Sequence, residues 1–434
     1  MKAYPKYKDS GIEWLGEVPE EWATKRLGYI TKCLDGFRIP INAENRSYIQ
    51  GEYPYWGANG VVDYVESYLF DEELVLLGED GAPFFEDYKT VSFHVNGKIW
   101  VNNHAHVLQP NMCKARFLTY CLNDTDYSHF IDGSTRDKLT QSAMRSIPIT
   151  FPSNHEQQAI ASFLDRETSR IDALIQKKER MIELLKEKRI ALITQAVTKG
   201  LDPNVPMKDS GIGWLGEVPK HWELLRIRNI VKPGNQGIKI GPFGSQIRSD
   251  ILVETGYKIY GQENVINDDF SLGDRYIDEQ TYRELFVCEI VPGDLLITMM
   301  GSSGQCKVLP EGYPIGIMDS HLIRLRTNSK VDTKYLELVI GSSVYAQHQI
   351  RLASKGSIMS GMNSSIIKDL LILVPSPIEQ KQIRAKVEKW MAKIDSLVKE
   401  ITKTISLLRE YRASLIHHAV TGKIDLRGYD AQAQ

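Results

Sequence analysis

The chain has 434 residues, of which 42% are apolar and 25% charged, a composition typical of folded globular proteins and unlike that of disordered chains. Its 53 basic residues are balanced by 55 acidic ones, which gives a formal net charge of −2. This balance excludes a protein that binds nucleic acid through its overall charge. Any nucleic-acid contact must therefore come from local patches.

Cysteine usage and the lengths of the apolar runs indicate the compartment. No two cysteines have the spacing of a zinc ribbon or a redox pair, and a sparse, odd count is typical of a reducing compartment. The first residues lack the apolar stretch of a signal peptide, and the densest apolar run, 370–374, is far shorter than the roughly 18–20 residues that cross a bilayer. We therefore expect a cytoplasmic protein with no membrane contact. The five cysteines are Cys33, Cys113, Cys121, Cys288 and Cys306.

The chain opens with a motif that it later repeats. Residues 8–22 read KDSGIEWLGEVPEEW and residues 208–222 read KDSGIGWLGEVPKHW, so 12 of 15 positions are identical at an offset of 200. A more diverged repeat relates 152–200 to 375–422 at an offset of 223. Two repeats in the same order indicate a tandem duplication of one long unit.

The first variable region, 23–151, is rich in Gly, aromatic and β-branched residues. Strand-like runs such as Glu73–Leu77 and Ile99–Val101 alternate with turn signals, which predicts a mixed α+β domain. Asn96-Gly97 predicts a type I′ hairpin turn. The second variable region, 223–374, has the same character but no obvious identity to the first.

The segments after Pro152 and Pro375 predict long helices of about 40 residues, each spanning roughly 60 Å. A heptad rhythm in both favours an antiparallel coiled coil between them, and packing of each helix on its own domain is the alternative. In the first helix we predict a seam of Leu164, Ile171, Leu185 and Leu192, with Leu174 and Met181 at the partner positions and Lys178 and Lys188 as interruptions. In the second we predict Val387, Ile394, Ile401, Leu408 and Leu415, with Trp390, Leu397 and Tyr411 at the partner positions.

The predicted fold is α+β. It has two mixed α/β domains separated by two long antiparallel coiled-coil helices in a pseudo-twofold tandem duplication. In the first half, the predicted segments are the motif 1–22, the variable domain 23–151 and the helix 152–200. The second half repeats this order as 201–222, 223–374 and 375–422, followed by the tail 423–434. Two similar frames around dissimilar contents suggest two different readouts.

Signatures of catalysis are missing from the sequence. It has no phosphate-binding loop, dinucleotide fingerprint, nucleophile elbow or zinc-protease helix motif, and no Asn/Asp-Pro-Pro-aromatic motif of the amino-methyltransferases. His104 and His106 could ligate a metal, but two locally hydrogen-bonded histidines at a strand end are the favoured interpretation. His417-His418 would favour a helix dipole. A solvated loop is the favoured interpretation of the acidic residues Asp71, Glu72, Glu73, Glu79 and Asp80.

Four polar loops carry residue types that contact phosphates and base edges, although such loops also cap helices. They are 133–141, 355–365, 241–248 and 301–305. The candidate DNA contacts, most of them from these loops, are Arg38, Asn59, Ser134, Thr135, Arg136, Lys138, Gln141, Gln246, Arg248, Ser302, Ser303, Gln305, Lys355, Ser357 and Asn363.

Several phrases of the sequence are distinctive: the repeated GIEWLGEVPEEW motif, YPYWGANGVVDYVESYLFDEELVLLGEDG, VNNHAHVLQP, GPFGSQI, PGDLLITMMGSSG and the Glu-Gln pair that opens both helices. Through them, and over nearly its whole length, the chain resembles the specificity subunits of type I restriction-modification systems. The resemblance implies two target-recognition domains, each reading one half of a split DNA sequence. The paired helices would set the gap between the halves and dock partner subunits.

The resemblance also implies the partners: double-stranded DNA, two modification subunits that methylate adenine with S-adenosylmethionine, and restriction subunits that use ATP and Mg²⁺. The chain itself would be non-catalytic and hold no cofactor. One departure stands out. Thr135-Arg136 in the first half corresponds to Ile358-Met359 in the second, so no contact is carried onto Met359 and we expect an asymmetric target.

Two other classes of function are alternatives to this one. A coiled-coil scaffold that binds proteins and no DNA would share the helices. An enzyme with two diverged catalytic domains would need a repeated acid/base or nucleophile constellation, and the sequence offers none.

Overall fold

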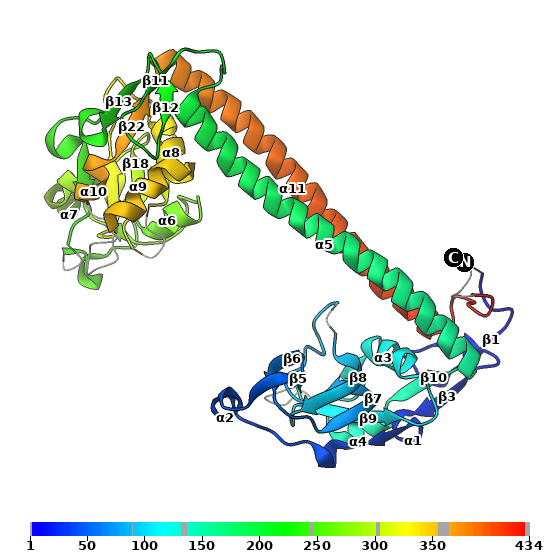
Figure 1. Cartoon of the computed structure of the whole chain (residues 1–434). Helices are drawn as coiled ribbons and strands as arrows, with labels where there is room; N and C mark the ends of the chain where they lie inside the picture. Colours follow the sequence, from blue (N-terminus) through cyan, green and yellow to red (C-terminus); the bar gives the residue numbers. More distant parts are fainter. Residues whose placement is uncertain are drawn as a thin grey trace. The chain divides into compact units, whose positions relative to one another are not determined.

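The computed structural model describes residues 2–88, 90–131, 137–243, 246–300, 304–354 and 364–429. The chain divides into two compact units. Unit 1 comprises Met1–Glu179 and Ile401–Gln434, and unit 2 comprises Arg180–Glu400. Each of the two long helices therefore contributes one part to each unit (Figure 1).

A six-stranded sheet forms the centre of unit 1, in the order β4-β9-β7-β8-β5-β6. All neighbouring strands are antiparallel except β5 and β8, and Leu74, Leu76 and Val107 are fully buried in its core. The strands are β4 (Thr31–Cys33), β5 (Gln50–Gly57), β6 (Gly60–Val65), β7 (Phe70–Gly78), β8 (Ser92–Val101) and β9 (Ala105–Pro110). Around them lie β1 (Tyr7–Asp9), β2 (Glu17–Pro19), β3 (Ala23–Arg26), α1 (Leu27–Ile30), η1 (Asp35–Phe37), α2 (Ala43–Ser47), α3 (Ala115–Asn123), η2 (Tyr127–His129), α4 (Gln141–Ser146) and β10 (Pro148–Phe151).

The predicted hairpin turn at Asn96-Gly97 is wrong. Strand β8 runs through both residues, which pair with Glu73 and Glu72 of β7. Gly97 keeps the positive φ of 95° that made the dipeptide a turn signal. The ladder with β7 continues on both sides of it, so the long-range pairing overrides the local preference.

Unit 2 holds two four-stranded sheets, in the orders β14-β21-β18-β19 and β16-β15-β20-β17. The first contains β14 (Ile238–Ile240), β18 (Leu295–Thr298), β19 (Cys306–Val308) and β21 (Leu322–Leu325), and the second contains β15 (Tyr257–Tyr260), β16 (Tyr276–Ile277), β17 (Glu289–Ile290) and β20 (Gly316–Met318). The remaining elements are β11 (Met207–Asp209), β12 (Glu217–Pro219), β13 (Glu223–Arg226), η3 (Ile227–Asn229), η4 (Gly234–Gln236), η6 (Ser249–Ile251), α6 (Gln262–Ile266), α7 (Glu279–Glu284), η7 (Phe286–Cys288), α8 (Thr333–Ser342), α9 (Val344–Ser354), α10 (Ser364–Asp369) and β22 (Leu371–Val374).

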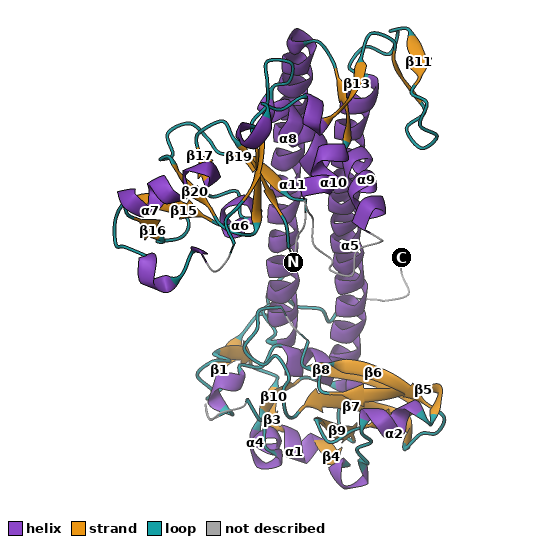
Figure 2. Ribbon diagram, turned by 90° about the vertical axis from the view of Figure 1, so that its left-hand side faces the viewer, coloured by secondary structure: helices purple, strands orange, loops and turns teal. Residues whose placement is uncertain are grey.

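The two units share one frame despite their dissimilar sequences. The pairs β1-β2 and β3-β10 of unit 1 correspond to β11-β12 and β13-β22 of unit 2, and all four are antiparallel. Figure 2 shows β3 beside β10 in unit 1. The antiparallel triplet β4-β9-β7 has its counterpart in β14-β21-β18. The two units differ in the other strands and helices that surround these triplets.

The long helices α5 (Asn154–Lys199) and α11 (Pro377–Val420) begin in the same way. Ser153 and Glu156 form a capping box, and in α11 the Ser376 hydroxyl accepts a hydrogen bond from the backbone N–H of Glu379. The same glutamates accept the indole N–H of a buried tryptophan: Trp22 to Glu156 at 3.2 Å and Trp222 to Glu379 at 3.0 Å. The repeated motif therefore anchors the start of each helix.

The glutamine that follows each of these glutamates holds a third element. The side-chain oxygen of Gln157 accepts the backbone N–H of Lys114, at the start of α3, at 2.9 Å. Gln380 does the same for Asp332, at the start of α8, at 2.8 Å. Both glutamines are fully buried, so each Glu-Gln pair joins the motif, the long helix and a domain helix.

In each unit the two long helices lie side by side (Figure 1), and the ion pairs Asp172–Arg412 and Glu179–Arg409 in unit 1 show that they run antiparallel there. The first predicted seam row is buried or half-buried throughout: Leu164, Ile171, Leu185, Leu192, Val387, Ile394, Ile401, Leu408 and Leu415. The α+β class with two mixed domains and two long antiparallel helices is thereby confirmed.

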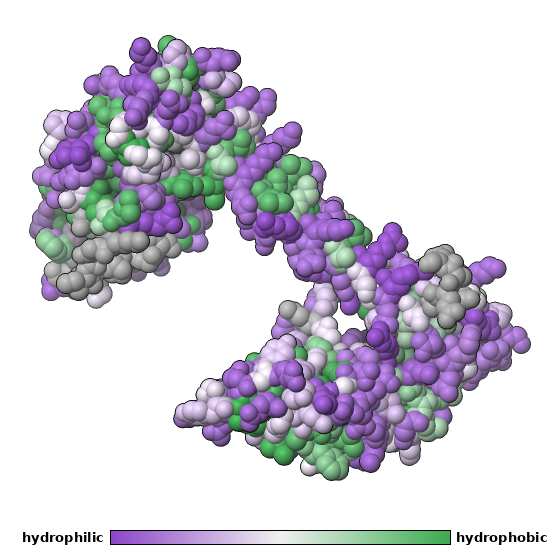
Figure 3. Space-filling view, viewed as in Figure 1, coloured by the Kyte–Doolittle hydropathy of each residue, from purple (hydrophilic) through white to green (hydrophobic). Residues whose placement is uncertain are grey.

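The predicted partner row is corrected by one residue. Leu174, Met181 and Tyr411 are 40%, 49% and 53% exposed, while Ile175 and Ile405 are buried. The second row lies four residues after the first, not three, and Leu397 and Trp390 are only half-buried at its flank. One residue turns a side chain by about 100° around the axis, which carries the predicted row out of the seam. Figure 3 shows apolar side chains interrupting the polar surface of the helices.

The end of each long helix meets the repeated motif of the other half of the chain. In unit 1, Lys423 just beyond α11 donates to the carbonyl of Glu17 at 2.6 Å, and Asp425 donates its backbone N–H to Lys2. In unit 2, Lys199 at the end of α5 donates to the carbonyl of Glu217.

Among the described residues, no helix is both long and apolar enough to cross a bilayer.

Candidate nucleic-acid interface

One edge of the shared strand triplet lies beside described parts of three predicted contact loops: 137–141 in unit 1, and 241–243 and 304–305 in unit 2. In unit 1, β4 and β7 end where β9 begins, since Cys33 pairs with Leu108 and Gly78 pairs with Ala105. In unit 2, β14 and β18 end where β21 begins. We call these two places the loop edges of units 1 and 2.

At the loop edge of unit 1, the segment Asp137–Gln141 lies on the ends of β7 and β9. Lys138 forms an antiparallel bridge with Asp80, and its ammonium lies 3.3 Å from a carboxylate oxygen of Glu79. Gln141 opens α4 and points its amide at Cys33 and Asp35. Both side chains are exposed, and thus available to a ligand.

Arg38 and Asn59 flank the same edge, with different exposures. The guanidinium of Arg38 donates to Glu79 at 2.6 Å and to the carbonyl of Ala105 at 2.7 Å, and its side chain is only 13% exposed. The geometry directs Arg38 at protein acceptors, so it holds the edge together and does not reach outward. Asn59 is exposed and lines a hollow of about 500 Å³ together with His104 and Asp137.

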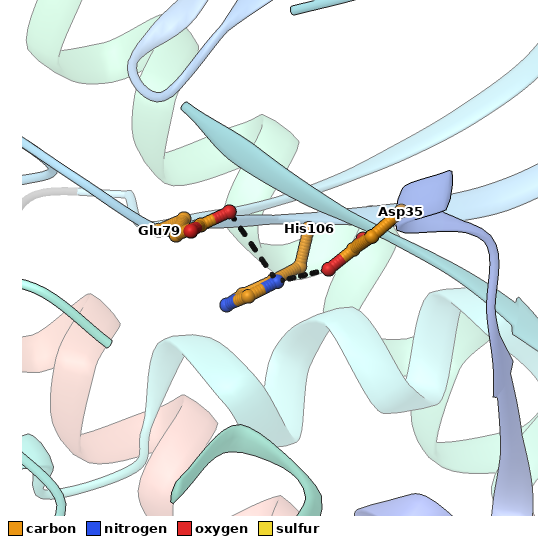
Figure 4. A group of neighbouring side chains, drawn as sticks. All are labelled: Asp35, Glu79 and His106. Carbon is orange, nitrogen blue, oxygen red and sulfur yellow. Dashed lines mark hydrogen bonds and ion pairs between the residues drawn. The ribbon is translucent and has the colours of Figure 1, made fainter. Parts of the chain in front are cut away.

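Beneath the edge lies a cluster of the buried His106 with the half-buried Asp35 and Glu79 (Figure 4). The Nδ1 atom of His106 lies 2.6 Å from Asp35 and 3.7 Å from Glu79, and Nε2 lies 2.9 Å from the carbonyl oxygen of Leu139. A carbonyl can only accept, so Nε2 carries a proton and donates to Leu139.

The cluster is electrostatically satisfied by side chains of the protein. Burial alone would raise the pKa of Asp35, but hydrogen bonds from His106 and the backbone N–H of Val107, with the charge of Arg38, hold that pKa down at about 2. The three ligand-type atoms lie within 4.8 Å of one another, yet Arg38 and Lys138 already neutralise Glu79. The arrangement is that of an ion cluster that fixes loops.

The neighbouring His104 does not join this cluster. It precedes β9, its side chain is 48% exposed, and its nearest charged partner is Asp80 at 3.8 Å. His106 is 1% exposed. The two imidazoles do not converge on one point, in contrast to the same-side geometry that alternation on a strand predicts.

At the loop edge of unit 2, the residues that lead into the two predicted loops lie against the start of β21. Gly241 donates its backbone N–H to the carbonyl of Leu322, and Met299 donates its backbone N–H to the carbonyl of His321. A Cβ atom at Gly241 would overlap the carbonyl oxygen of Asp319, and only glycine permits this close approach. Gln262 completes the junction by accepting the backbone N–H groups of Met299 and Met300.

The described candidate residues of unit 2 are all exposed at or near this edge. Gln246 closes its own loop by accepting the N–H of Phe243, Arg248 faces Asp250 at 3.4 Å, and Gln305 leads into β19. Phe243 is 82% exposed beside Gln246. The candidates Ser134, Thr135, Arg136, Ser302, Ser303, Lys355, Ser357 and Asn363 lie outside the described residues.

Sequence reasoning missed His321, Gln262 and Arg275 at the edge of unit 2. His321 occupies the register position of His106, because Leu108 and Ile323 pair with the last residues of β4 and β14. Arg275 pairs with Asp319 at 2.8 Å. A faint signal existed, since His106-Val107-Leu108 and His321-Leu322-Ile323 share a pattern of histidine and two apolar residues.

A hollow accompanies the domain helix in each unit. In unit 1 it measures about 820 Å³ and lies between α3, the start of β8 and the long helices, with Trp56 Nε1 and Ser92 Oγ unpaired in its wall. His417 of α11 bridges to Asp124 at the end of α3 beside it, at 3.0 Å. In unit 2 a hollow of about 730 Å³ lies between α8, β19 and α11. The duplicated frame thus places a hollow beside the corresponding domain helix in each unit.

Comparisons with known proteins point to one family. Residues 19–184 match the type I restriction modification DNA specificity domain. The chain is 27% identical to a proposed type I restriction enzyme specificity subunit of Haemophilus influenzae, over 90% of this chain and 91% of the relative, and 21% identical to the EcoDI specificity subunit of Escherichia coli, over 94% and 90%.

The fold matches solved structures of the same kind. One is a chain from a type I R-M system whose complex assembly and conformational transition were studied, with a TM-score of 0.69 at 13% identity over 94% of this chain and 99% of that one. Another is the HsdS subunit from Thermoanaerobacter tengcongensis, with a TM-score of 0.51 at 13% identity over 94% and 98%. At these identities the likeness establishes the fold.

Proposed function

The chain belongs to the specificity subunits of type I restriction-modification systems, and on this basis we propose that it reads a bipartite, asymmetric DNA target through its two recognition domains. One observation carries the proposal: the same strand triplet presents a loop edge in each unit, and the two edges carry different side chains. Different donors and acceptors select different bases, so each edge would read its own half-site.

The proposal includes the partners. Two modification subunits would dock on the duplicated frame, since two copies of one partner require two similar surfaces, and restriction subunits would join that core. The chain itself would be non-catalytic, with S-adenosylmethionine, ATP and Mg²⁺ bound by the partners, and the complex would act on double-stranded DNA in the cytoplasm. The net charge of −2 suggests that the partners supply much of the phosphate contact. No observation favours a scaffold that binds no DNA.

The test is genome-wide adenine methylation by single-molecule sequencing, in a host that expresses this chain with its modification subunit. We expect a split motif with two different halves that disappears when this chain is deleted. The purified chain with S-adenosylmethionine alone should methylate nothing. An unchanged methylation pattern on deletion, with the modification subunit shown to be expressed, would refute the proposal.

A further inference from the structure

The segment that carries Lys138 and Gln141, two of the described candidate contacts of unit 1, is held at Leu139. Leu139 is fully buried, donates its backbone N–H to the carbonyl of Glu79 at 2.8 Å and accepts the Nε2–H of His106 at 2.9 Å. Lys138 precedes it and Gln141 follows two residues later. The position of both side chains therefore depends on how Leu139 is held.

His106 links that segment to the half-buried carboxylates of Asp35 and Glu79. Its ring stands between Leu139 on one side and Asp35, with Glu79 further away, on the other. The same carboxylates contact the candidates directly: Glu79 pairs with the ammonium of Lys138, and Asp35 accepts the amide of Gln141 at 3.3 Å. One imidazole therefore connects the backbone of the segment to the groups that orient its side chains.

We propose that His106 is a positioning residue for the first half-site: by holding the carbonyl of Leu139 it places Lys138 and Gln141 for contact with DNA. The proposal rests on the DNA-reading function proposed above. It concerns the first half-site, and His321, at the same register position in unit 2, differs from His106 in being half exposed beside Asp319 and Ser320.

Two substitutions separate positioning from general support of the fold. In His106→Gln the amide nitrogen takes the place of Nε2 and can still donate to Leu139. In His106→Asn the amide takes the place of Nδ1, which preserves the bond to Asp35 and removes the one to Leu139. His321→Asn is the matched control at the same register position in unit 2.

The experiment measures methylation rates of the assembled complex on DNA with single base changes in either half-site. We expect H106N to lower discrimination in the first half-site by about tenfold or more, the size of one good side-chain–base contact, and to leave the second half-site unchanged. H106Q should retain the parent's discrimination, and H321N should leave the first half-site as in the parent. Equal loss from H106N and H106Q, or no loss from H106N, would overturn the proposal.

If H106N does not assemble, Lys138→Ala and Gln141→Ala carry the same test. At least one must weaken discrimination in the first half-site, and if neither does, the segment is not read and the proposal is wrong. Failure of the DNA-reading function itself would look different, because the parent complex would then show no sequence-dependent methylation at all.

Discussion

The two loop edges place a histidine at the same register position and use it in opposite ways. His106 is 1% exposed and bonded on both ring nitrogens, above a carboxylate pair and beneath Leu139. His321 is 50% exposed beside Asp319 and Ser320. Because His106 is buried, it links groups inside unit 1, whereas His321 is exposed and accessible to a ligand. The same frame therefore supports two kinds of loop edge.

This contrast separates what the duplication conserves from what it varies. Both units keep the Trp–Glu anchor, the buried glutamine and the antiparallel triplet. In unit 1 an ion cluster holds the segment 137–141, whereas in unit 2 Gly241 approaches Asp319 closely and Gln262 accepts the backbone N–H groups of Met299 and Met300. We therefore expect equivalent substitutions in the shared frame to have equal effects in the two units, and a substitution at a loop edge to affect only the unit that contains it.

The largest expected effect comes from the frame. Trp22 and Trp222 are each 1% exposed, and replacing either with alanine removes a buried indole and the hydrogen bond that it donates to Glu156 or Glu379. We expect each substitution to lower the free energy of unfolding of its own unit by about 3–5 kcal/mol. Hydrogen exchange followed by mass spectrometry, peptide by peptide, measures the loss in each unit.

The equality of the two losses is the sharper part of this prediction. Trp214, which is 42% exposed, provides the control, because its replacement by alanine should cost far less. Loss in only one unit, or a difference of several kcal/mol between W22A and W222A, would show that the two halves of the frame are not energetically equivalent.

The sequence predicted the elements that depend on local pattern or on outright repetition. The repeat of Glu156-Gln157 at Glu379-Gln380 placed both helix starts, and the first heptad row was correct because burial follows a seven-residue period. The partner row was misplaced since the seam alternates steps of three and four residues, and a single helix sequence does not say which step comes first. That Ile175 and not Leu174 is buried in the seam follows only from the packing of the second helix.

The candidate sites depended on pairing between distant strands, which the sequence did not reveal. Lys138 and Gln141 were found from loop composition, but their link to Asp35 and His106 follows from β4 pairing with β9. His321 was missed because its equivalence to His106 is a matter of register. The Asn96-Gly97 turn failed for the same reason, since β7 pairs through it.

A smaller effect is expected from Gly241 at the edge of unit 2. Alanine there would push against the carbonyl oxygen of Asp319 and force the 241 loop away from β21, at a cost of about 1–3 kcal/mol. We expect Gly241→Ala to weaken discrimination in the second half-site and to leave the first unchanged, measured by methylation of singly altered targets. Gly213→Ala is the control, because its Cβ would meet open space. Loss of discrimination in the first half-site would contradict the independence of the edges.

The smallest expected effect is a pH dependence confined to unit 1. The hydrogen bond to Asp124 raises the pKa of His417 above its ordinary value, against the effect of burial. Because the pKa of His417 is higher in the folded chain than in the unfolded chain, its protonation stabilises the fold. This stabilisation is complete below the pKa of the unfolded chain, near 6.5, and it disappears as the pH rises through the pKa of the folded chain. In unit 2 the corresponding position in the repeat is Thr194, which accepts the N–H of Val344 and does not titrate.

The imidazole of His417 is 43% exposed, so solvent screening should keep the change below about 1 kcal/mol. Hydrogen exchange corrected for intrinsic rates should show the ends of α3 and α11 losing protection as the pH rises above 6.5, while peptides around Thr194 and Val344 show no such loss. His417→Asn keeps a donor at the Nδ1 position without a titrating group, so its slope at these helix ends should vanish. If H417N kept the same pH dependence of protection, that dependence would have to come from a group other than His417. The contact between α11 and α3 in unit 1 would then be as independent of pH as the contact between Thr194 and Val344 in unit 2.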